Sequence, residues 1–497
     1  MKKIFFLVAL AIGMTASAAE YLVKYRNYEA MKSLMTMSMA PSSGMRIMGH
    51  HDRGSYFKVY IDRSQLVPTL MRLLTDKNVE WVVPNIKLKA FTTPVEANRL
   101  REQWAIAKVN AEKAWQRAGN KGSRNIVVAV IDTGVDYRHE SLAPNMIPGY
   151  DFRENDNDPY DKTSVQNPGH GTHCAGAVGA TGLVDNGIVG LSPEVSIMPI
   201  RFLGEDGSGD LDGGIKSIDY AIQKKAHVIS ASWGAAVPRS TAAPLLEAVK
   251  RADDAGVIFV AAAANDGRNN DVRDVFPTNA NTPNMIAVAA SGPSDTKPSW
   301  SNYGKAMVHL ASPGENIIST LPNNKYGNLS GTSMATPLVS GLVAFLKSQD
   351  PSLTGAEVRA LLQTTGAKVN IETACNCRVD AFAAVDHLLS KKPWLVPAAA
   401  TIDENASLTI KMKNGRAPIQ FTSSNPSVIS VDNNGVVRAV GKGTAQITAK
   451  DADGVTVTSL DIHVGKSSGG GGGSCPIGDD MLCEIICRLK PDLPICK

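Results

Sequence analysis

Residues 126–134 read Ile-Val-Val-Ala-Val-Ile-Asp-Thr-Gly, a run of six apolar residues that ends in an acidic residue and a turn-forming glycine. A short, continuous and largely β-branched apolar run is typical of a strand that is buried on both faces, as in a parallel sheet. Asp132 therefore directly follows a strand that we expect to lie in the core of the protein.

Strands of the same kind recur along the chain and alternate with segments of helical periodicity. From Trp104 to about Leu389 this alternation predicts an α/β fold in which helices cover both faces of a parallel sheet. The other expected strands are His227–Ser230, Val257–Ala263 and Ile286–Ala290, and the expected helices include Ile215–Lys225 and Pro244–Ala255.

A smaller unit precedes this region. Strands and helices mix within residues 21–91, which predicts a small α+β, ferredoxin-like module followed by the linking segment Thr92–Glu102. Its expected strands are Tyr21–Tyr25, Phe57–Ile61 and Val79–Phe91, and its expected helices are Glu29–Met37 and Gln65–Leu74.

The pattern changes again near Pro393. Short alternating strands with Asn-Asn-Gly and Lys-Gly turns predict a small β-sandwich over residues 393–465. The Ser/Gly-rich residues 466–474 predict a flexible linker, and four of the seven cysteines follow in residues 475–497. An exported chain favours disulfides in this tail, and zinc binding is the alternative.

Composition and charge restrict the class of protein. The 497 residues are 43% hydrophobic and 20% charged, which excludes a wholly disordered or fibrous chain. A net charge of +4 supplies no basic stripe, so no nucleic-acid partner is expected. Lys2, Lys3 and the apolar Ile4–Met14 predict a signal peptide over residues 1–18. Because no apolar run reaches the roughly 20 residues of a membrane span, we expect a secreted protein, extracellular or periplasmic.

Three segments carry groups that acyl-transfer chemistry uses. Asp132 follows the buried strand, His170 lies between two glycines, and Ser333 precedes an apolar helix expected from Met334 to Leu346. A serine hydroxyl becomes a nucleophile when an imidazole takes its proton, and a buried carboxylate holds that imidazole in the required tautomer. The chain order Asp, His, Ser is that of the subtilisin triad.

A nucleophile of this kind also needs donors for the negative charge that develops on the substrate. Asn265 follows an apolar strand, in a loop that ends at Gly267, and its amide can donate a hydrogen bond to an oxyanion. The helix after Ser333 adds the partial positive charge of its N-terminus. We expect Pro337 in the first turn of that helix, where an N–H group would have no partner in any case.

These motifs closely resemble those of the subtilisin-like serine proteases. The matching segments are Val130–Asp136, His170–Gly176 and Gly331–Pro337, and Cys174 is the variant typical of proteinase K relatives. The resemblance covers residues 103–390 and implies endopeptidase activity on polypeptides. In this family such a cysteine is usually buried and free, although a redox or nucleophilic thiol is the alternative.

The resemblance also implies two backbone segments that pair with an extended peptide substrate. Asp266 follows the oxyanion candidate directly, so basic residues should be accepted before the scissile bond beside the favoured apolar ones. The implied substrate-binding residues are Gly207, Ser208, Gly209, Ser232, Trp233, Gly234, Ala263 and Asp266.

The flanking units resemble accessory parts of the same proteins. Residues 19–95 resemble an inhibitory propeptide, which implies a zymogen that is held by its own propeptide and cuts itself between about Phe91 and Glu102. Residues 393–465 resemble a bacterial immunoglobulin-like domain of group two, most visibly in Ser423–Val431. Substrate and propeptide are the only partners implied, so we expect a monomer.

A cluster of acidic residues lies in a short segment before His170. Calcium takes 6–8 oxygen ligands, and a bound cation would relieve the repulsion between neighbouring carboxylates. The sequence therefore predicts a structural calcium site, with an ordinary solvated loop as the alternative. The predicted ligands are Asp151, Asp156, Asp158 and Asp161.

The same residues also bear on three other possible functions. Asp132-Thr133-Gly134 is also found in aspartic proteases, but their chemistry needs a second carboxylate motif, which the sequence lacks. An adhesin with an inactive protease-like scaffold would leave the β-sandwich as the functional part, and the complete Asp, His, Ser set argues against it. A hydrolase of small esters is a third hypothesis.

Overall fold

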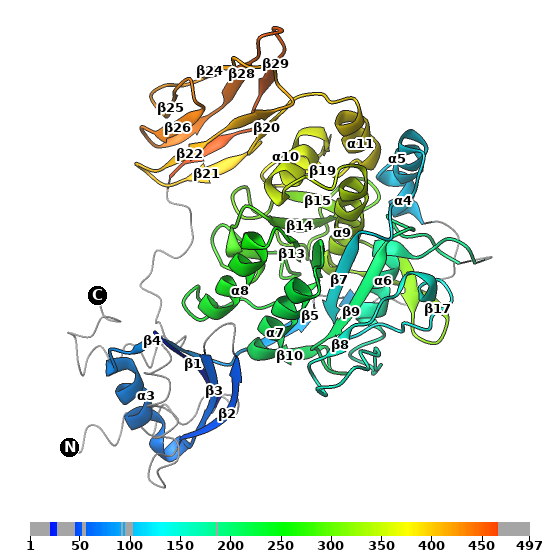
Figure 1. The fold of residues 1–497 in the computed structure, drawn as a ribbon, viewed down its shortest axis with the longest axis vertical. Coiled ribbons are helices and arrows are strands. Elements are labelled where there is room, and N and C mark those ends of the chain that lie inside the picture. Colours follow the sequence, from blue (N-terminus) through cyan, green and yellow to red (C-terminus); the bar gives the residue numbers. More distant parts are fainter. Residues whose placement is uncertain are drawn as a thin grey trace.

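The computed structural model describes residues 20–26, 45–51, 56–90, 93–94, 103–184 and 187–465. Figure 1 shows a small N-terminal unit, a large α/β body and a C-terminal unit of β-strands. The expected helix Glu29–Met37, the predicted signal peptide and the cysteine-rich tail lie outside the described residues.

A nine-stranded sheet runs through the α/β body. In spatial order its strands are β18 (Ala367–Lys368), β19 (Cys377–Arg378), β15 (Leu310–Pro313), β14 (Met285–Ser291), β13 (Ile258–Ala262), β11 (Val228–Ala231), β7 (Val127–Asp132), β9 (Ser196–Arg201) and β8 (Tyr150–Asp151). All neighbours pair in parallel except the edge pair β18 and β19, which is antiparallel. The predicted parallel sheet is confirmed.

Both faces of this sheet are buried, and alternate residues of β7 contribute to two different core clusters. Val128 and Val130 pack in one cluster, and Ala129 and Ile131 pack in the other. The first cluster includes residues of α4 (Trp104–Lys108), α5 (Ala111–Ala118), α6 (His170–Gly179), α9 (Thr332–Gln349), α10 (Gly355–Thr365) and α11 (Ala381–Leu389). The second includes residues of α7 (Leu211–Gln223) and α8 (Ala243–Asp254). Short 3-10 helices cover Arg63–Gln65, Ala143–Asn145 and Thr278–Ala280.

The N-terminal unit is an antiparallel sheet with the strand order β2-β3-β1-β4. Its elements are β1 (Glu20–Tyr25), β2 (Met45–His51), β3 (Tyr56–Ile61), α3 (Leu66–Thr75) and β4 (Val79–Pro84). Charged side chains dock it on the body: Lys24 Nζ lies 2.8 Å from Glu247 of α8, and Lys58 Nζ lies 3.0 Å from Asp210, the residue that caps α7.

Two short strands follow this unit and enter the α/β body. Strand β5 (Lys87–Ala90) lies between β10 (Ser208–Asp210) and β12 (Trp233–Gly234), and β6 (Thr93–Pro94) pairs with β17 (Lys325–Ser330), which pairs in turn with β16 (Ile317–Leu321). The expected single run Val79–Phe91 is therefore two strands, and part of the expected link is a third.

The C-terminal unit consists of small sheets around its own core. Ile410, Val437, Ile447 and Ile462 are fully buried in it. Its strands are β20 (Trp394–Val396), β21 (Ala400–Ile402), β22 (Ser407–Thr409), β23 (Lys411–Lys413), β24 (Gln420–Ser423), β25 (Ile429–Val431), β26 (Val436–Ala439), β27 (Gly443–Ala445), β28 (Ile447–Lys450), β29 (Thr456–Thr458) and β30 (Ile462–Val464). These pairs are antiparallel apart from β21 with β30.

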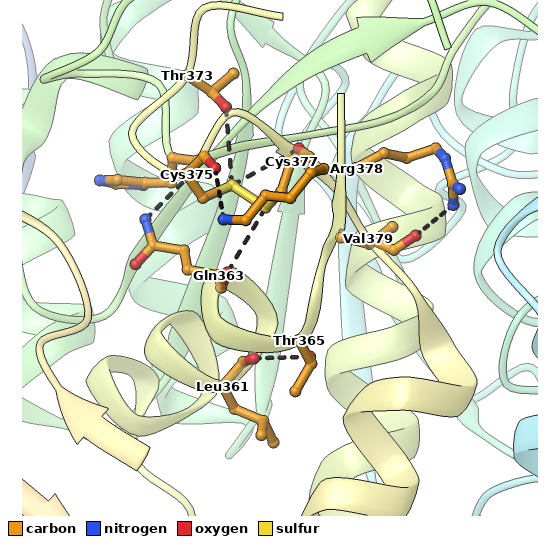
Figure 2. Close-up of a disulfide and its surroundings, with 10 residues drawn as sticks. Leu361, Gln363, Thr365, Thr373, Cys375, Cys377, Arg378 and Val379 are labelled. Carbon is orange, nitrogen blue, oxygen red and sulfur yellow. Dashed lines mark hydrogen bonds between the residues drawn. A yellow bond between two sulfur atoms is a disulfide. The ribbon is translucent and has the colours of Figure 1, made fainter. Parts of the chain in front are cut away.

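A disulfide lies at the edge of the main sheet, where Cys375 and Cys377 are joined with Sγ atoms 1.99 Å apart (Figure 2). Gly366, at the end of α10, makes room for it, because a Cβ at that position would lie 2.5 Å from the Cys377 sulfur. Arg378 follows, and its guanidinium lies 2.7 Å from Asp295. The sequence had left the pairing of these two cysteines open.

Within the part of the chain that the structure describes, no helix has both the length and the apolar character needed to cross a bilayer.

Candidate active site

Asp132 and His170 form a buried pair at the carboxyl end of β7. Asp132 is the last residue of the strand and His170 is the first residue of α6. The Nδ1 atom of His170 lies 2.6 Å from Oδ1 of Asp132, and both residues are at most 2% exposed. The backbone N–H of Thr133 donates to the same oxygen at 2.7 Å. The carboxylate is thus placed to hold the proton on Nδ1, which leaves Nε2 as the basic atom.

Ser333 is brought to the same buried region by the first turn of α9. Its hydroxyl donates to the carbonyl of Ser232 at 2.9 Å, while Nε2 of His170 has no hydrogen-bond partner among the described residues. To pass its proton to His170, the hydroxyl must turn away from Ser232. Such loose geometry is common in catalytic sites without substrate.

The backbone carbonyl of Ser333 accepts hydrogen bonds from side chains outside α9, and Pro337 explains why it has no donor within the helix. The helix begins at Thr332, so Pro337 lies beyond the first turn, which corrects the sequence expectation. Proline has no N–H to donate to the carbonyl four residues earlier. That carbonyl, of Ser333, accepts the Ser232 hydroxyl at 2.9 Å and the Cys174 thiol at 3.5 Å instead.

Asn265 presents a buried donor without a partner. Its Oδ1 accepts the N–H of Thr332 at 3.0 Å and the hydroxyl of Thr332 at 2.9 Å, which fixes the orientation of the amide. Its Nδ2 is buried and has no hydrogen-bond partner among the described residues. An oriented amide donor beside the serine can stabilise an oxyanion. Sequence reasoning missed Thr332, whose only signal was its place before Ser333.

Cys174 and His173 lie next to this group but are held in unreactive forms. Burial raises the pKa of the Cys174 thiol, and the nearby Asp132 raises it further, so the thiol stays protonated. Burial lowers the pKa of His173 to about 3, and its Nε2 lies 2.9 Å from the carbonyl of Ile317. The Cys174 thiol is thus buried and free, as the resemblance implies, and the His173 imidazole is buried in its neutral form.

The four acidic residues predicted to bind calcium do not converge. Asp151 pairs with Arg201 at 2.6 Å, and Asp158 accepts the Tyr137 hydroxyl at 2.7 Å. Asp156 accepts the N–H of Asp158, and Asp161 faces the catalytic segments. Among the described residues, one group of three His, Cys, Asp or Glu side chains has its potential ligand atoms within 4.8 Å of one another. This group is Asp132, His170 and Cys174, and it includes none of the four predicted calcium ligands. The predicted ligand set is therefore not assembled, because each carboxylate has a different partner.

Most of the predicted substrate-binding residues surround β5. Gly207 accepts the N–H of Ala90 at 3.1 Å, and β10 and β12 pair with β5 on its two sides. Two of the predicted residues do not belong to these strands. Asp266 is exposed, and Ala263 packs in a small core cluster, where its carbonyl accepts a hydrogen bond from the Asn270 side chain.

Comparisons with known proteins agree with this geometry. The model of the subtilase family matches residues 123–388, and that of the intimin immunoglobulin-like domain matches residues 405–453. Thermitase of Thermoactinomyces vulgaris is 37% identical over 297 residues, which is 59% of this chain and 100% of thermitase. The thermophilic serine proteinase of Bacillus sp. (strain AK1) is 38% identical over 292 residues, 59% of this chain and 68% of its own length.

The major intracellular serine protease of Bacillus subtilis (strain 168) is 40% identical over 257 residues, which is 52% of this chain and 77% of that protease. The family match spans the main sheet and every residue of the Asp132, His170 and Ser333 cluster. The chain belongs to the subtilase family and is a subtilisin-like serine endopeptidase.

Proposed function

We propose that Ser333, His170 and Asp132 are the catalytic triad of this endopeptidase. The observation that carries the proposal is the buried 2.6 Å contact between Asp132 and His170 Nδ1, which leaves Nε2 without a partner among the described residues. Cys174, which lies within 4.8 Å of this pair, donates to the Ser333 carbonyl at 3.5 Å and so links the pair to the first turn of α9. In this arrangement Ser333 attacks the scissile carbonyl while Nε2 takes its proton, and Asp132 stabilises the imidazolium that forms. The same Nε2 then protonates the leaving amine, and water hydrolyses the acyl-enzyme.

We propose that Asn265 is one donor of the oxyanion hole. Its Nδ2 is buried and without a partner, and the two contacts from Thr332 keep it from turning away. In the first turn of α9 the N–H of Thr332 donates to Asn265 Oδ1, and those of Met334 and Ala335 donate to the Gly331 carbonyl. The N–H of Ser333 is therefore the proposed second donor, and the N-terminus of the helix adds a partial positive charge.

We propose that residues 19–95 are an inhibitory propeptide and that the chain cuts itself after Phe91. Strand β5 ends at Ala90 opposite Trp233, and β6 begins at Thr93 opposite Ser330, three residues before the nucleophile. Ser232, the residue before Trp233, has the carbonyl that accepts the Ser333 hydroxyl, so the proposed cut lies shortly after Ala90 in the sequence. Phe91 and Thr92 themselves lie outside the described residues.

The strand β5 also supports a proposal about the substrate. Leu88, three residues before Phe91, is fully buried. A Cβ on Gly214 would lie 2.9 Å from its Cδ1, 3.5 Å from Phe202 and 3.7 Å from Trp233. Glycine inside a helix is destabilising by roughly 0.5–1 kcal/mol relative to alanine. We therefore infer that Gly214 is present because its missing side chain leaves space for Leu88. We propose that a peptide substrate places a leucine-sized apolar side chain in this pocket, along β10 and β12.

The remaining expectations stay proposals. We propose that residues 1–18 direct secretion, that the catalytic domain covers 103–390, and that the mature enzyme is a monomer. We propose that residues 393–465 are a separate immunoglobulin-like domain, joined through residues 466–474 to the cysteine-rich tail. Asp266, which is exposed, is proposed to make basic residues acceptable before the scissile bond.

Subtilases commonly bind calcium, but we propose no ion for the acidic loop of this chain. Arg201, which is 2% exposed, lies 2.6 Å from Asp151 and 2.9 Å from Glu154 and already supplies a positive charge there. Asp161 is occupied by four protein donors, so it has no free lone pair directed at the loop.

Replacing Ser333 by Ala should abolish proteolysis, because no other group can act as the nucleophile. The expected loss in turnover is about 10⁶-fold, the magnitude known from subtilisin, a relative. Hydrolysis of a fluorogenic peptide measures it, and thermal unfolding checks that the variant is folded. Proteolysis at the wild-type rate by a folded Ser333→Ala protein would rule out the serine mechanism.

Replacing Asn265 by Ala should lower turnover by about 10²- to 10³-fold with little effect on KM, because the donor acts on charge that develops in the transition state. Asn265→Asp is the matched variant, since it keeps the acceptor for Thr332 and replaces the donor with an ionisable carboxyl oxygen. Steady-state kinetics of both variants test the assignment. If Asn265→Asp turns over like wild type, Nδ2 is not an oxyanion donor.

The mature protein should begin at Thr92, because β5 ends at Ala90 opposite Trp233, next to the Ser232 carbonyl that contacts the Ser333 hydroxyl. N-terminal sequencing and intact mass of the purified enzyme measure this. The Ser333→Ala precursor, purified in the absence of other proteases, should keep its propeptide. Processing of that variant at the same bond would show that another protease makes the cut.

Replacing Gly214 by Val should lower kcat/KM by about 10-fold or more for peptides with leucine as the fourth residue before the cut, because the new side chain fills the pocket. The same peptides with alanine at that position are the control, and their cleavage should change little. Equal losses for both peptide series would show that Gly214 does not set the size of this pocket.

A further inference from the structure

Asp161 is a buried carboxylate that the triad chemistry does not use. It is 0% exposed, and it lies between the segments that carry Asp132 and His170. Its Oδ1 accepts the Thr133 hydroxyl at 2.8 Å and the Asn167 amide at 3.0 Å. Its Oδ2 accepts the N–H of Thr172 at 2.9 Å and the hydroxyl of Thr172 at 2.7 Å. An aspartate that accepts four hydrogen bonds uses all of its acceptor positions as the ionised form.

Two side chains that donate to Asp161 also accept a hydrogen bond from a backbone N–H at or next to the catalytic histidine. The Thr133 hydroxyl, which donates to Asp161, accepts the N–H of Gly171 at 2.9 Å. The Asn167 amide donates to Asp161 with its nitrogen and accepts the N–H of His170 with its oxygen at 2.8 Å. Because the carboxylate can only accept, it fixes which atom of each partner faces the N-terminus of α6.

The third partner extends the same pattern to the other catalytic segment. The Thr172 hydroxyl donates to Asp161 and accepts the N–H of Asp136 at 2.9 Å. Asp136 lies four residues after Asp132, in the loop that leaves β7. One carboxylate thus ties the start of α6, the end of β7 and the loop before His170 into a single network of defined polarity.

We propose that Asp161 is a positioning residue for the catalytic pair: it holds Asp132 and His170 at their 2.6 Å separation by directing the hydrogen bonds of Thr133, Asn167 and Thr172. The proposal rests on the proposed role of Asp132 and His170. Misplacement of catalytic groups by about 1 Å can lower a rate by about 10²-fold, so a network of this kind acts on turnover.

Asparagine at position 161 is the sharpest test because it has the same shape and the opposite polarity on one side. Its NH₂ group would face a hydrogen-bond donor of Thr133, Asn167 or Thr172, so at least one of these three side chains would have to turn. A side chain that turns would lose its hydrogen bond from a backbone N–H of the catalytic segments. Burial raises the pKa of the Asp161 carboxyl, and the hydrogen bonds from Asn167 and Thr172 oppose that shift. Asparagine removes this charge as well.

The experiment compares Asp161→Asn with Asp158→Asn in the full chain after maturation. Asp158 lies in the same acidic loop but accepts an exposed hydrogen bond from Tyr137, so it controls for the loss of one charge. For Asp161→Asn we expect kcat to fall about 10- to 100-fold with KM nearly unchanged, and for Asp158→Asn neither to change. The proton on His170 Nδ1, followed by NMR, should also move in Asp161→Asn alone, since it reports the contact with Asp132.

A second variant covers the case in which Asp161→Asn does not fold. Thr172→Val keeps the shape of the side chain, removes one donor to Asp161 and should lower kcat by a smaller factor with the same shift of the His170 resonance. In the double variant the two losses should not add, because both act through one network. Wild-type kcat and an unmoved resonance in a folded Asp161→Asn or Thr172→Val protein would overturn the proposal. That result, together with an inactive Ser333→Ala protein, would leave the proposed triad intact.

Discussion

The parallel pairing of β7 with β11 and β9 is the constraint on which the active site depends. Both faces of β7 are buried, so a shift of its register by one residue would exchange the side chains of the two core clusters. The carboxyl end of the strand, and with it Asp132, is thereby fixed. Helices α6 and α9 share one of these clusters, and their first turns carry His170 and Ser333 to the same end of the strand.

Hydrogen bonds with a defined donor and acceptor fix the orientation of groups that the packing brings together. Pro337 leaves the Ser333 carbonyl without a helical donor, and Ser232 and Cys174 take its place. Thr332 orients the Asn265 amide by donating twice to its oxygen. In both cases a buried atom that would otherwise be unsatisfied holds a segment of the proposed active site, because an unpaired buried polar group is strongly unfavourable.

The strands proposed to bind substrate are paired with β5, which follows the N-terminal unit. Strand β5 completes a three-stranded sheet with β10 and β12, so main-chain hydrogen bonds supply binding that does not depend on side chains. In the proposed binding mode, selectivity comes from pockets such as the space beside Gly214, which holds Leu88. Ion pairs from Lys24 and Lys58 to α8 and to the cap of α7 add contacts that a short peptide substrate lacks.

The sequence by itself determined the α/β fold and the family, and it singled out Asp132, His170 and Ser333, because buried strands have a local apolar signature and the three motifs are short and contiguous. Tertiary structure alone decided the partner of each polar atom. The acidic loop illustrates this: in sequence its carboxylates form one cluster, whereas Arg201, Tyr137 and the catalytic segments each take a different one. Hydrogen bonds join residues that are distant along the chain, so composition within a loop cannot reveal them.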